Sequence, residues 1–462
     1  MLLVLLSVAV APMAAATVLV DSNGLASDDR PNPTNAAMEK GVSDFRKRIG
    51  EVEWAKLKKR LETVNQNIVA NGILTFGNDP KSLLTGYAYH QFYDWDLYFE
   101  NIYMSYYGIS EFCCNNFEAF MKLQKPDGFI QRAFGTKEWG VNQPFKPFLA
   151  QIAILGSKQR GDNYEWLRDK YYDQLGKYID RWFAYDGDSN GLPVWESADA
   201  SGMDNQFRRS GSRDSYFNEG VYLQCYLYRE LQAMSYIAGK LGKSDDQKQY
   251  LARAKVLAKK VNAILWDDKD GFYYDRNEKT GKLNHLKSAA GFLPLWAGIA
   301  SRKQAQRLVN EHLLNTNEFW LAYPVATYAR TEKDFYEGSK GGECNWQGPA
   351  WIPINYMIFH GLVRYGYKEA ARDLAYRTFA MALDKNPVTR EFYDSDTGKG
   401  NGMNPFWGWS TLAYVMPLEF ESGYNPMDFK EKIQPVLAEY LKIRRFGHPT
   451  DRIENPKAPG RF

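Results

Sequence analysis

The amino-acid sequence predicts an all-α protein whose helices close into a double ring. Apolar residues recur with helical spacing over most of the 462 residues, whereas the alternating runs typical of strands are few. No rhythm of strand, helix and strand appears, so a parallel sheet covered by helices is not expected. The helical stretches come in pairs with short connections but show no fixed-period repeat. A closed ring therefore fits the sequence better than an open solenoid.

The first long helix is expected within residues 44–71, where apolar residues form a stripe at a spacing of about 3.6 residues. The stripe consists of Phe45, Ile49, Val52, Leu57, Leu61, Val64 and Ile68. Similar stretches predict helices at 97–107, 112–123, 146–156, 164–185, 216–241, 245–265, 302–314, 349–365, 368–383 and 428–443. Together these helices are expected to form a single domain over residues 36–445.

Both ends of the chain are expected to lie outside this domain. Residues 1–16 are apolar and end in small residues, as signal peptides do, which predicts a secreted or periplasmic protein. The apolar run continues to about 19 residues, so an uncleaved N-terminal membrane anchor is the alternative. Residues 17–35 are expected to form a linker, and the basic, Pro- and Gly-rich residues 446–462 a surface tail.

Composition and charge argue against several kinds of partner. The formal net charge is only +3, which does not favour a nucleic acid. The four cysteines and five histidines show no zinc-ligand spacing. The loop that begins at Asp186 resembles a calcium loop, but its twelfth position is Ser197 rather than Glu, so no metal or other cofactor is predicted. Aromatic residues make up 15% of the chain, and such planar rings form either a very large core or flat surfaces that stack on sugar rings. Tyr is the most frequent of them, which favours a water-filled cleft.

Residues able to carry chemistry cluster in loops between the predicted helices. These loops are 89–101, 124–135, 195–206, 341–356 and 389–410. Most of them mix carboxylates with aromatic rings and glycine, which suits a polar, ring-shaped ligand. Cleavage of a glycosidic bond needs one protonated carboxyl group for the leaving oxygen and one ionised group to activate water or attack carbon. The candidate carboxyl groups are Asp94, Asp96, Glu196, Asp199, Asp204, Glu343, Glu391, Asp394 and Asp396.

Asp204 is the candidate general acid. Gly202 precedes it and frees the backbone, and the neighbouring Met203 and Trp195 are expected to desolvate the carboxyl group and raise its pKa. The alternative is that Asp204 caps a helix or forms a turn within the loop.

Glu391 is the candidate general base. Arg390 and Tyr393 lie close to it in sequence and are expected to keep the carboxylate ionised and hydrogen-bonded. The alternative is a solvated surface acid. Because Asp204 and Glu391 are far apart in the chain, only a closed or folded-back architecture would bring them together.

The same loops carry a resemblance to a known family of enzymes. The motifs are WDxxF at Trp95 to Phe99, PDGF at Pro126 to Phe129, SGMDN at Ser201 to Asn205, WxGPxWxxxNY at Trp346 to Tyr356, GLxRYG at Gly361 to Gly366 and EFYDxxTGxG at Glu391 to Gly400. In this order they resemble glycoside hydrolase family 63, in particular its mannosylglycerate and glucosylglycerate hydrolases. Trehalase and processing α-glucosidase I are more distantly similar. The resemblance extends over roughly residues 86–420.

The resemblance implies an (α/α)6 barrel and hydrolysis with inversion at the anomeric carbon, with Asp204 as general acid and Glu391 as general base. It also implies a sugar pocket of aromatic and polar side chains. The residues assigned to this pocket are Tyr89, Tyr93, Trp95, Asp96, Gln131, Gly202, Trp346, Gln347, Trp351, Trp407 and Trp409. Asp96 is equally well explained as a helix cap. The basic candidates for binding a glycerate group are Arg132, Arg208, Arg209 and Arg213.

The sequence therefore predicts an inverting α-glycosidase that hydrolyses a small α-glucoside or α-mannoside such as mannosylglycerate or glucosylglycerate. Tyr93 stands where the similar enzymes are expected to have Trp, which leaves the preferred sugar open. One alternative is an exported α-glucosidase or trehalase-like enzyme that acts on oligosaccharides. The other is a ring-shaped protein that binds or isomerises a sugar without hydrolysing it.

Overall fold

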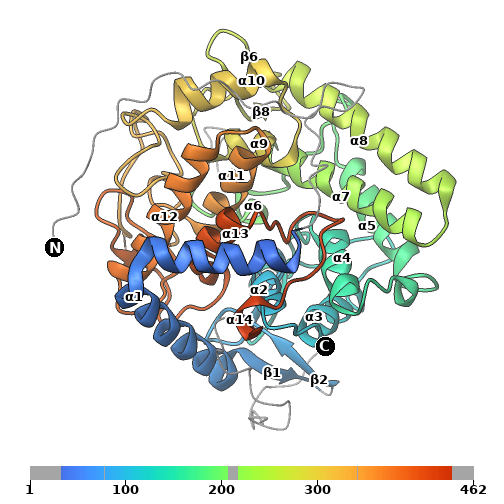
Figure 1. Ribbon diagram of the computed structural model, residues 1–462. Helices are drawn as coiled ribbons and strands as arrows, with labels where there is room; N and C mark the ends of the chain where they lie inside the picture. Colours follow the sequence, from blue (N-terminus) through green and yellow to red (C-terminus); the bar gives the residue numbers. More distant parts are fainter. Residues whose placement is uncertain (1–32, 78, 207–216, 341, 440–462) are drawn as a thin grey trace.

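The computed structural model describes residues 33–77, 79–206, 217–340 and 342–439, and in this part of the chain the helices form two concentric rings (Figure 1). The inner ring contains α2 (Asp94–Ser105), α4 (Leu149–Gln159), α7 (Val221–Lys240), α9 (Leu293–Ala297), α11 (Ile352–Arg364) and α13 (Met416–Ser422). The outer ring contains α1 (Asn35–Asn67), α3 (Glu111–Met121), α5 (Tyr171–Ala184), α8 (Ser244–Ile264), α10 (Arg302–Arg307) and α12 (Lys368–Asp384). The predicted all-α double ring is confirmed.

Contacts between neighbouring inner elements run from α2 through α4, α7, α9 and α11 to the 3-10 helix η5 (Trp409–Tyr414), which leads into α13. A further contact joins η5 to α2. Glu419 on α13 reinforces this closure, since its carboxylate accepts hydrogen bonds from Tyr106 after α2 and from Tyr356 on α11. The ring is therefore closed between α2 and the segment formed by η5 and α13.

Burial distinguishes the two rings. Every residue of α2 is buried, whereas α8 in the outer ring buries only Ala254, Leu257, Ala258 and Val261. A helix that is buried on all sides must lie inside other helices, and a helix with one apolar stripe covers them from outside.

Short antiparallel strands join the helices and shape the loops. Those that frame candidate site residues are β3 (Gln91–Tyr93) paired with β4 (Ala133–Gly135) and β10 (Phe392–Tyr393) paired with β11 (Gly400–Asn401). The other pairings are β1 (Ile73–Phe76) with β2 (Asp79–Leu84), β6 (Trp266–Asp267) with β7 (Phe272–Tyr273), and β5 (Asn218–Glu219) with β8 (Arg276–Asn277) and β9 (Lys282–Leu283). The remaining short helical segments are η1 (Ile68–Gly72), η2 (Glu165–Leu167), α6 (Ala198–Ser201), η3 (Ala289–Phe292), η4 (Leu308–Leu313) and α14 (Val436–Glu439).

Two predictions about the helices were wrong. Val52 was placed on the buried stripe but is 80% exposed, because Gly50 (φ 82°, ψ 165°) breaks the helical path and turns the following residues to a new face. Trp54 is buried after the break instead. A helix was also expected over 428–443, but within the described residues only Val436–Glu439 are helical there.

The predicted signal peptide, most of the predicted linker and the predicted tail lie outside the described residues. Among the helices that are described, none combines the length and the apolar character needed to cross a bilayer.

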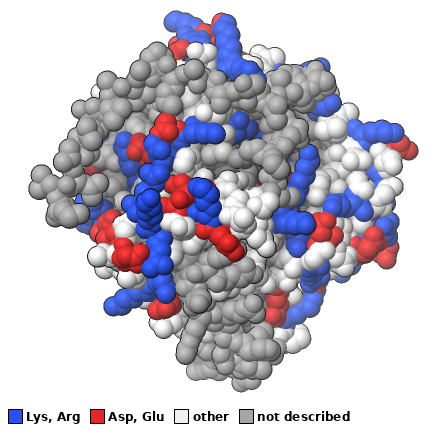
Figure 2. All heavy atoms as spheres, viewed as in Figure 1, with Lys and Arg blue, Asp and Glu red and all other residues white. Residues whose placement is uncertain are grey.

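On the face that carries α1, basic and acidic side chains are interspersed (Figure 2), and several form ion pairs such as Arg46 with Glu51 and Arg48 with Glu421.

Candidate active site

The backbone around Asp204 is hydrogen-bonded to a loop that lies about 140 residues further along the chain. The neighbouring Asn205 accepts a hydrogen bond from the main-chain N–H of Trp346 at 2.7 Å and donates one to Asn345 Oδ1 at 3.1 Å. Gln347 adds a bond from its Nε2 to the carbonyl oxygen of Asn205 at 2.6 Å. These contacts hold Asp204 at the edge of the Trp346 segment, and its side chain remains 39% exposed.

Glu391 is held more tightly and more deeply. It is 6% exposed, and its Oε2 accepts a hydrogen bond from the main-chain N–H of Met403 at 2.8 Å. The thiol of Cys344 lies 3.8 Å from Oε1 as a further donor. Gly402 (φ 72°), which follows β11, lets the main chain approach Glu391 closely, because a Cβ at that position would lie 2.4 Å from Oε2. The alternative of a solvated surface acid is therefore excluded.

The expected electrostatics of Glu391 were wrong. Burial raises the pKa of Glu391 to about 7, and the charge of Asp204 adds to the rise, although the hydrogen bonds from Met403 and Cys344 and the charge of Arg390 oppose it. The hydroxyl of Tyr393 accepts a hydrogen bond from the main-chain N–H of Arg390 at 3.0 Å instead of serving the carboxylate.

Asp204 and Glu391 lie close enough for their charges to interact, although they are far apart in sequence. The charge of Asp204 contributes to the raised pKa of Glu391, and after burial the two carboxylates are the main causes that raise the pKa of the Cys344 thiol. Cys344 is half-buried and was noted in the sequence only as an isolated cysteine. The fold therefore brings the two predicted acids together, and it places a thiol beside them that the sequence did not assign to the site.

Arg132 and Tyr93 lie near Asp204, and Tyr89 contacts Tyr93. The guanidinium Nη2 of Arg132 lies 3.7 Å from Asp204 Oδ1, and its central carbon lies 5.6 Å from the centre of the Tyr93 ring. Tyr89 is hydrogen-bonded to Tyr93, and burial raises the pKa of both hydroxyls, that of Tyr93 to about 12. Gln131 lies in the same segment, but its Nε2 donates to the carbonyl oxygen of Ala133 at 2.7 Å.

A buried charged cluster supports the start of α2. Both carboxylate oxygens of Asp94 accept hydrogen bonds from Nζ of Lys146 at 2.9 Å. Oδ2 of Asp94 also accepts the main-chain N–H of Lys146 at 2.9 Å. Asp96, which is 3% exposed, accepts a hydrogen bond from the Tyr87 hydroxyl at 2.8 Å. Burial, with a contribution from Asp94, raises the pKa of Asp96. In the described part of the chain no side chain caps α2, so the alternative role of Asp96 as a helix cap is not supported.

Gly202 is placed against this cluster. Its φ is 76°, and a Cβ there would lie 2.5 Å from Cε of Lys146 and 3.6 Å from the Trp95 ring. The glycine of the SGMDN motif is thus required both by its backbone conformation and by the close approach of Lys146. Sequence reasoning missed Lys146 and Tyr87. A lysine within the otherwise apolar stretch before α4 was the one available signal.

The tryptophans of the predicted wall, apart from Trp407, form a column of packed rings of which one pair is stacked. Trp346 stacks on Trp351 with ring centres 3.7 Å apart, and Trp95 lies 6.0 Å from Trp346. Trp409 donates its Nε1–H to the carbonyl oxygen of Glu391 at 3.0 Å. All four rings are almost fully buried, so they pack on one another, and Trp409 helps to hold Glu391 in position.

Trp407 lies apart from this column. Its Nε1–H donates to the carbonyl oxygen of Thr85 at 2.6 Å, and its ring lines a cavity of about 160 Å³ formed with α1 and residues 387–389. Its assignment to the sugar pocket therefore has no support in the structure. Arg208, Arg209 and Arg213 fall outside the described residues.

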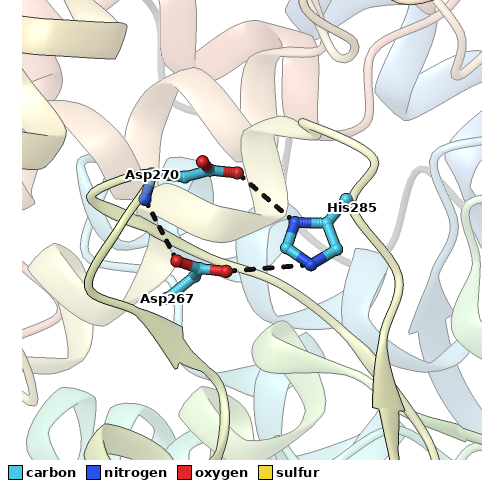
Figure 3. Close-up of side chains that lie close together, drawn as sticks. All are labelled: Asp267, Asp270 and His285. Carbon is cyan, nitrogen blue, oxygen red and sulfur yellow. Dashed lines mark hydrogen bonds and ion pairs between the residues drawn. The ribbon is translucent and has the colours of Figure 1, made fainter.

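Two groups of side chains that could hold a metal ion lie elsewhere in the described residues. Asp186 and Asp188 of the calcium-like loop approach Glu278, which supplies the carboxylate that the loop itself lacks, but Arg276 already pairs with Asp188 at 2.9 Å. The other group is shown in Figure 3, where both ring nitrogens of His285 face carboxylates, Nδ1 at 3.3 Å from Asp270 and Nε2 at 3.7 Å from Asp267. Neither group contains a residue of the active site, and the absence of a metal requirement stays a prediction.

Comparison with known proteins places the chain in a family. Residues 89–410 match the model of the mannosylglycerate hydrolase MGH1-like glycoside hydrolase domain. The mannosylglycerate hydrolase of Rubrobacter radiotolerans is 28% identical over 211 residues, which are 45% of this chain and 44% of that protein. The cytosolic neutral trehalase of Kluyveromyces lactis is 32% identical over 192 residues, which are 37% of this chain and 25% of the trehalase. The aligned regions thus span less than half of these relatives.

The fold is similar to solved structures at low sequence identity. The GH63 mannosylglycerate hydrolase from Thermus thermophilus, in complex with glucose, superposes with a TM-score of 0.60 at 20% identity and covers 78% of this chain and 99% of that one. Neutral trehalase from Saccharomyces cerevisiae gives a TM-score of 0.56 at 19% identity, with 84% and 85% covered. The family model covers more than half of the chain, and the chain accordingly belongs to the mannosylglycerate hydrolase MGH1-like glycoside hydrolases.

Proposed function

We propose that the protein is an inverting α-glycosidase that hydrolyses a small α-glucoside or α-mannoside. The observation that carries the proposal is that Asp204 and Glu391 lie close enough for their charges to interact and yet have different surroundings. Asp204 is partly exposed and donates its proton to the leaving oxygen. Glu391 is buried and oriented by the main chain, and it takes a proton from the attacking water. A pKa of about 7 suits a base that acts near neutral pH.

Mannosylglycerate and glucosylglycerate are the first candidate substrates. The chain belongs to a family named for mannosylglycerate hydrolase, and Arg132 beside Asp204 offers a cation to a carboxylate in the leaving group. A panel of 4-nitrophenyl α-glycosides, the two glycerate glycosides and α-linked disaccharides tests the proposal. Release of the free sugar supports hydrolysis. Binding without release, or conversion to an isomer, would instead favour the alternative of a sugar-binding or sugar-isomerising protein.

We expect the first sugar released from an α-glycoside to be the β-anomer. An inverting enzyme leaves room for water between base and sugar, with carboxyl groups about 6.5–9.5 Å apart, whereas a retaining enzyme holds them at about 5–5.5 Å. NMR of the product before mutarotation distinguishes the two outcomes. An initial α-anomer, or a glycosyl ester trapped on Glu391, would overturn the inverting mechanism.

The pH profile is expected to report the environment of Glu391. Because the base must be ionised, kcat/KM should fall as the pH drops below about 7. The Cys344 thiol lowers the pKa of Glu391, so Cys344→Ala should move this acidic limb to higher pH. Cys344→Ser keeps a donor and serves as the matched control, with a limb close to that of the wild type. Movement of the limb to lower pH in Cys344→Ala would contradict the assignment.

A further inference from the structure

Trp139 differs from every other tryptophan of the protein. All 13 tryptophans lie in the described part of the chain, and Trp139 alone is exposed, at 59%. Single apolar side chains on a surface are common and need no functional explanation by themselves. What sets Trp139 apart is how its loop is held and what its ring touches.

A buried glutamine fixes the loop that carries Trp139. The side chain of Gln91 on β3 is fully buried, and its Nε2 donates to the carbonyl oxygens of Lys137 at 3.1 Å and Trp139 at 3.4 Å. Its Oε1 accepts the main-chain N–H of Lys137 at 3.0 Å. Thr136 adds a bond to the carbonyl oxygen of Tyr89 at 2.8 Å. The indole is therefore presented to solvent from an anchored backbone, which lowers the entropic cost of using it to bind a ligand.

The ring of Trp139 adjoins the candidate active site. Its centre lies 6.1 Å from that of Tyr89, at an interplanar angle of 68°. Tyr89 is hydrogen-bonded to Tyr93, whose ring faces the guanidinium of Arg132. Gly140, next to Trp139, would place a Cβ 3.5 Å from Cβ of Arg132. A continuous set of aromatic and cationic side chains therefore leads from Trp139 to Asp204.

Exposure increases from the buried Glu391, through the partly exposed Tyr93 and Asp204, to Trp139. Asp96 and Glu391 are buried, Tyr89 and Tyr93 are half-buried, and Trp139 is mostly exposed. The sugar whose glycosidic bond is cleaved occupies the buried end of the site, where the proposed base Glu391 lies. The leaving group must therefore extend towards the exposed end, where Trp139 lies. Arg132 and Tyr93 stand beside the acid and border the first position of the leaving group. Trp139, one ring further out, borders the next.

We propose that Trp139 is a specificity-determining residue for the leaving group, where its indole stacks on the pyranose ring of the second sugar. Besides the small α-glycosides proposed above, the site would then accept α-linked oligosaccharides of three or more sugars. A flat apolar ring suits the C–H face of a pyranose, and an exposed platform accepts it without displacing other side chains. This inference rests on the proposed function and extends it to the leaving group.

The test compares kcat/KM for a disaccharide and a trisaccharide of the same sugar and α-linkage. Trp139→Ala should lower the trisaccharide-to-disaccharide ratio of kcat/KM about tenfold, equivalent to about 1.4 kcal/mol. Trp139→Phe keeps a flat ring and should restore most of the ratio. Leu251→Ala removes an exposed apolar side chain on α8 and should leave both values unchanged.

The outcomes separate this inference from the proposed function. If the wild type hydrolyses both sugars and Trp139→Ala lowers both rates equally, or neither, the specificity role is overturned while the hydrolase function stands. If the wild type hydrolyses no α-glycoside, the proposed function fails. Calorimetry of the trisaccharide with Glu391→Gln, alone and combined with Trp139→Ala, then decides the binding role. Equal affinity in the two proteins would overturn it, and an affinity about tenfold weaker in the double variant would support it.

Discussion

Glu391→Gln and Asp204→Asn are each expected to lower kcat by at least about 100-fold and to leave substrate affinity largely intact. Glutamine keeps the shape of Glu391 and can still accept the hydrogen bond from Met403, but it cannot take a proton from water. Asparagine at position 204 likewise keeps its place beside Arg132 but cannot supply a proton to the leaving oxygen. The loss should therefore appear in the chemical step rather than in binding.

Steady-state kinetics on a substrate with a poor leaving group, together with calorimetric binding, measures this effect. Asp396→Asn is the matched control, because Asp396 lies in the same segment as Glu391 but pairs with Arg330 at the surface. Its kcat should remain close to that of the wild type. Near-normal turnover in either active-site variant would remove that residue from the proposed mechanism.

Lys146→Met is expected to destabilise the folded protein by about 3–5 kcal/mol, because it leaves the buried carboxylate of Asp94 without its cation. Neither side chain of the pair is exposed, so water cannot replace the lost partner. Gly202 contacts Lys146, and the loop that carries Asp204 should therefore be disturbed as well.

Denaturant unfolding of the variant and the wild type measures the loss in the free energy of unfolding. Lys248→Met provides the control, since Lys248 pairs with Asp245 in full solvent and such pairs contribute little. An unchanged unfolding midpoint for Lys146→Met would mean that the buried pair does not stabilise the fold.

The sequence predicted the helical ring and indicated Asp204 and Glu391 as candidate catalytic acids because these inferences depend on local signals. Helical periodicity identifies helices wherever one face is buried, and the SGMDN and EFYD motifs fixed Asp204 and Glu391. The pairing of Asp94 with Lys146 and the contact of Cys344 with Glu391 were missed, because each joins residues that are remote in sequence. For the same reason the pKa of Glu391 was expected to be low. Neighbours in sequence suggested charge stabilisation, whereas its burial arises only in the folded ring.

The contact between α2 and η5 has a consequence for the order in which the protein acquires activity. An open stack of helix pairs can grow from any point, each pair stabilising the next. A closed ring also requires two segments, here about three hundred residues apart in sequence, to meet. The entropic cost of bringing them together delays this step. Trp409 and Ser410 of η5 bind the carbonyl oxygen of Glu391, and α2 carries Asp96. The candidate active site is thus completed where the ring closes, so recovery of activity during refolding is expected to report completion of the topology rather than formation of the helices.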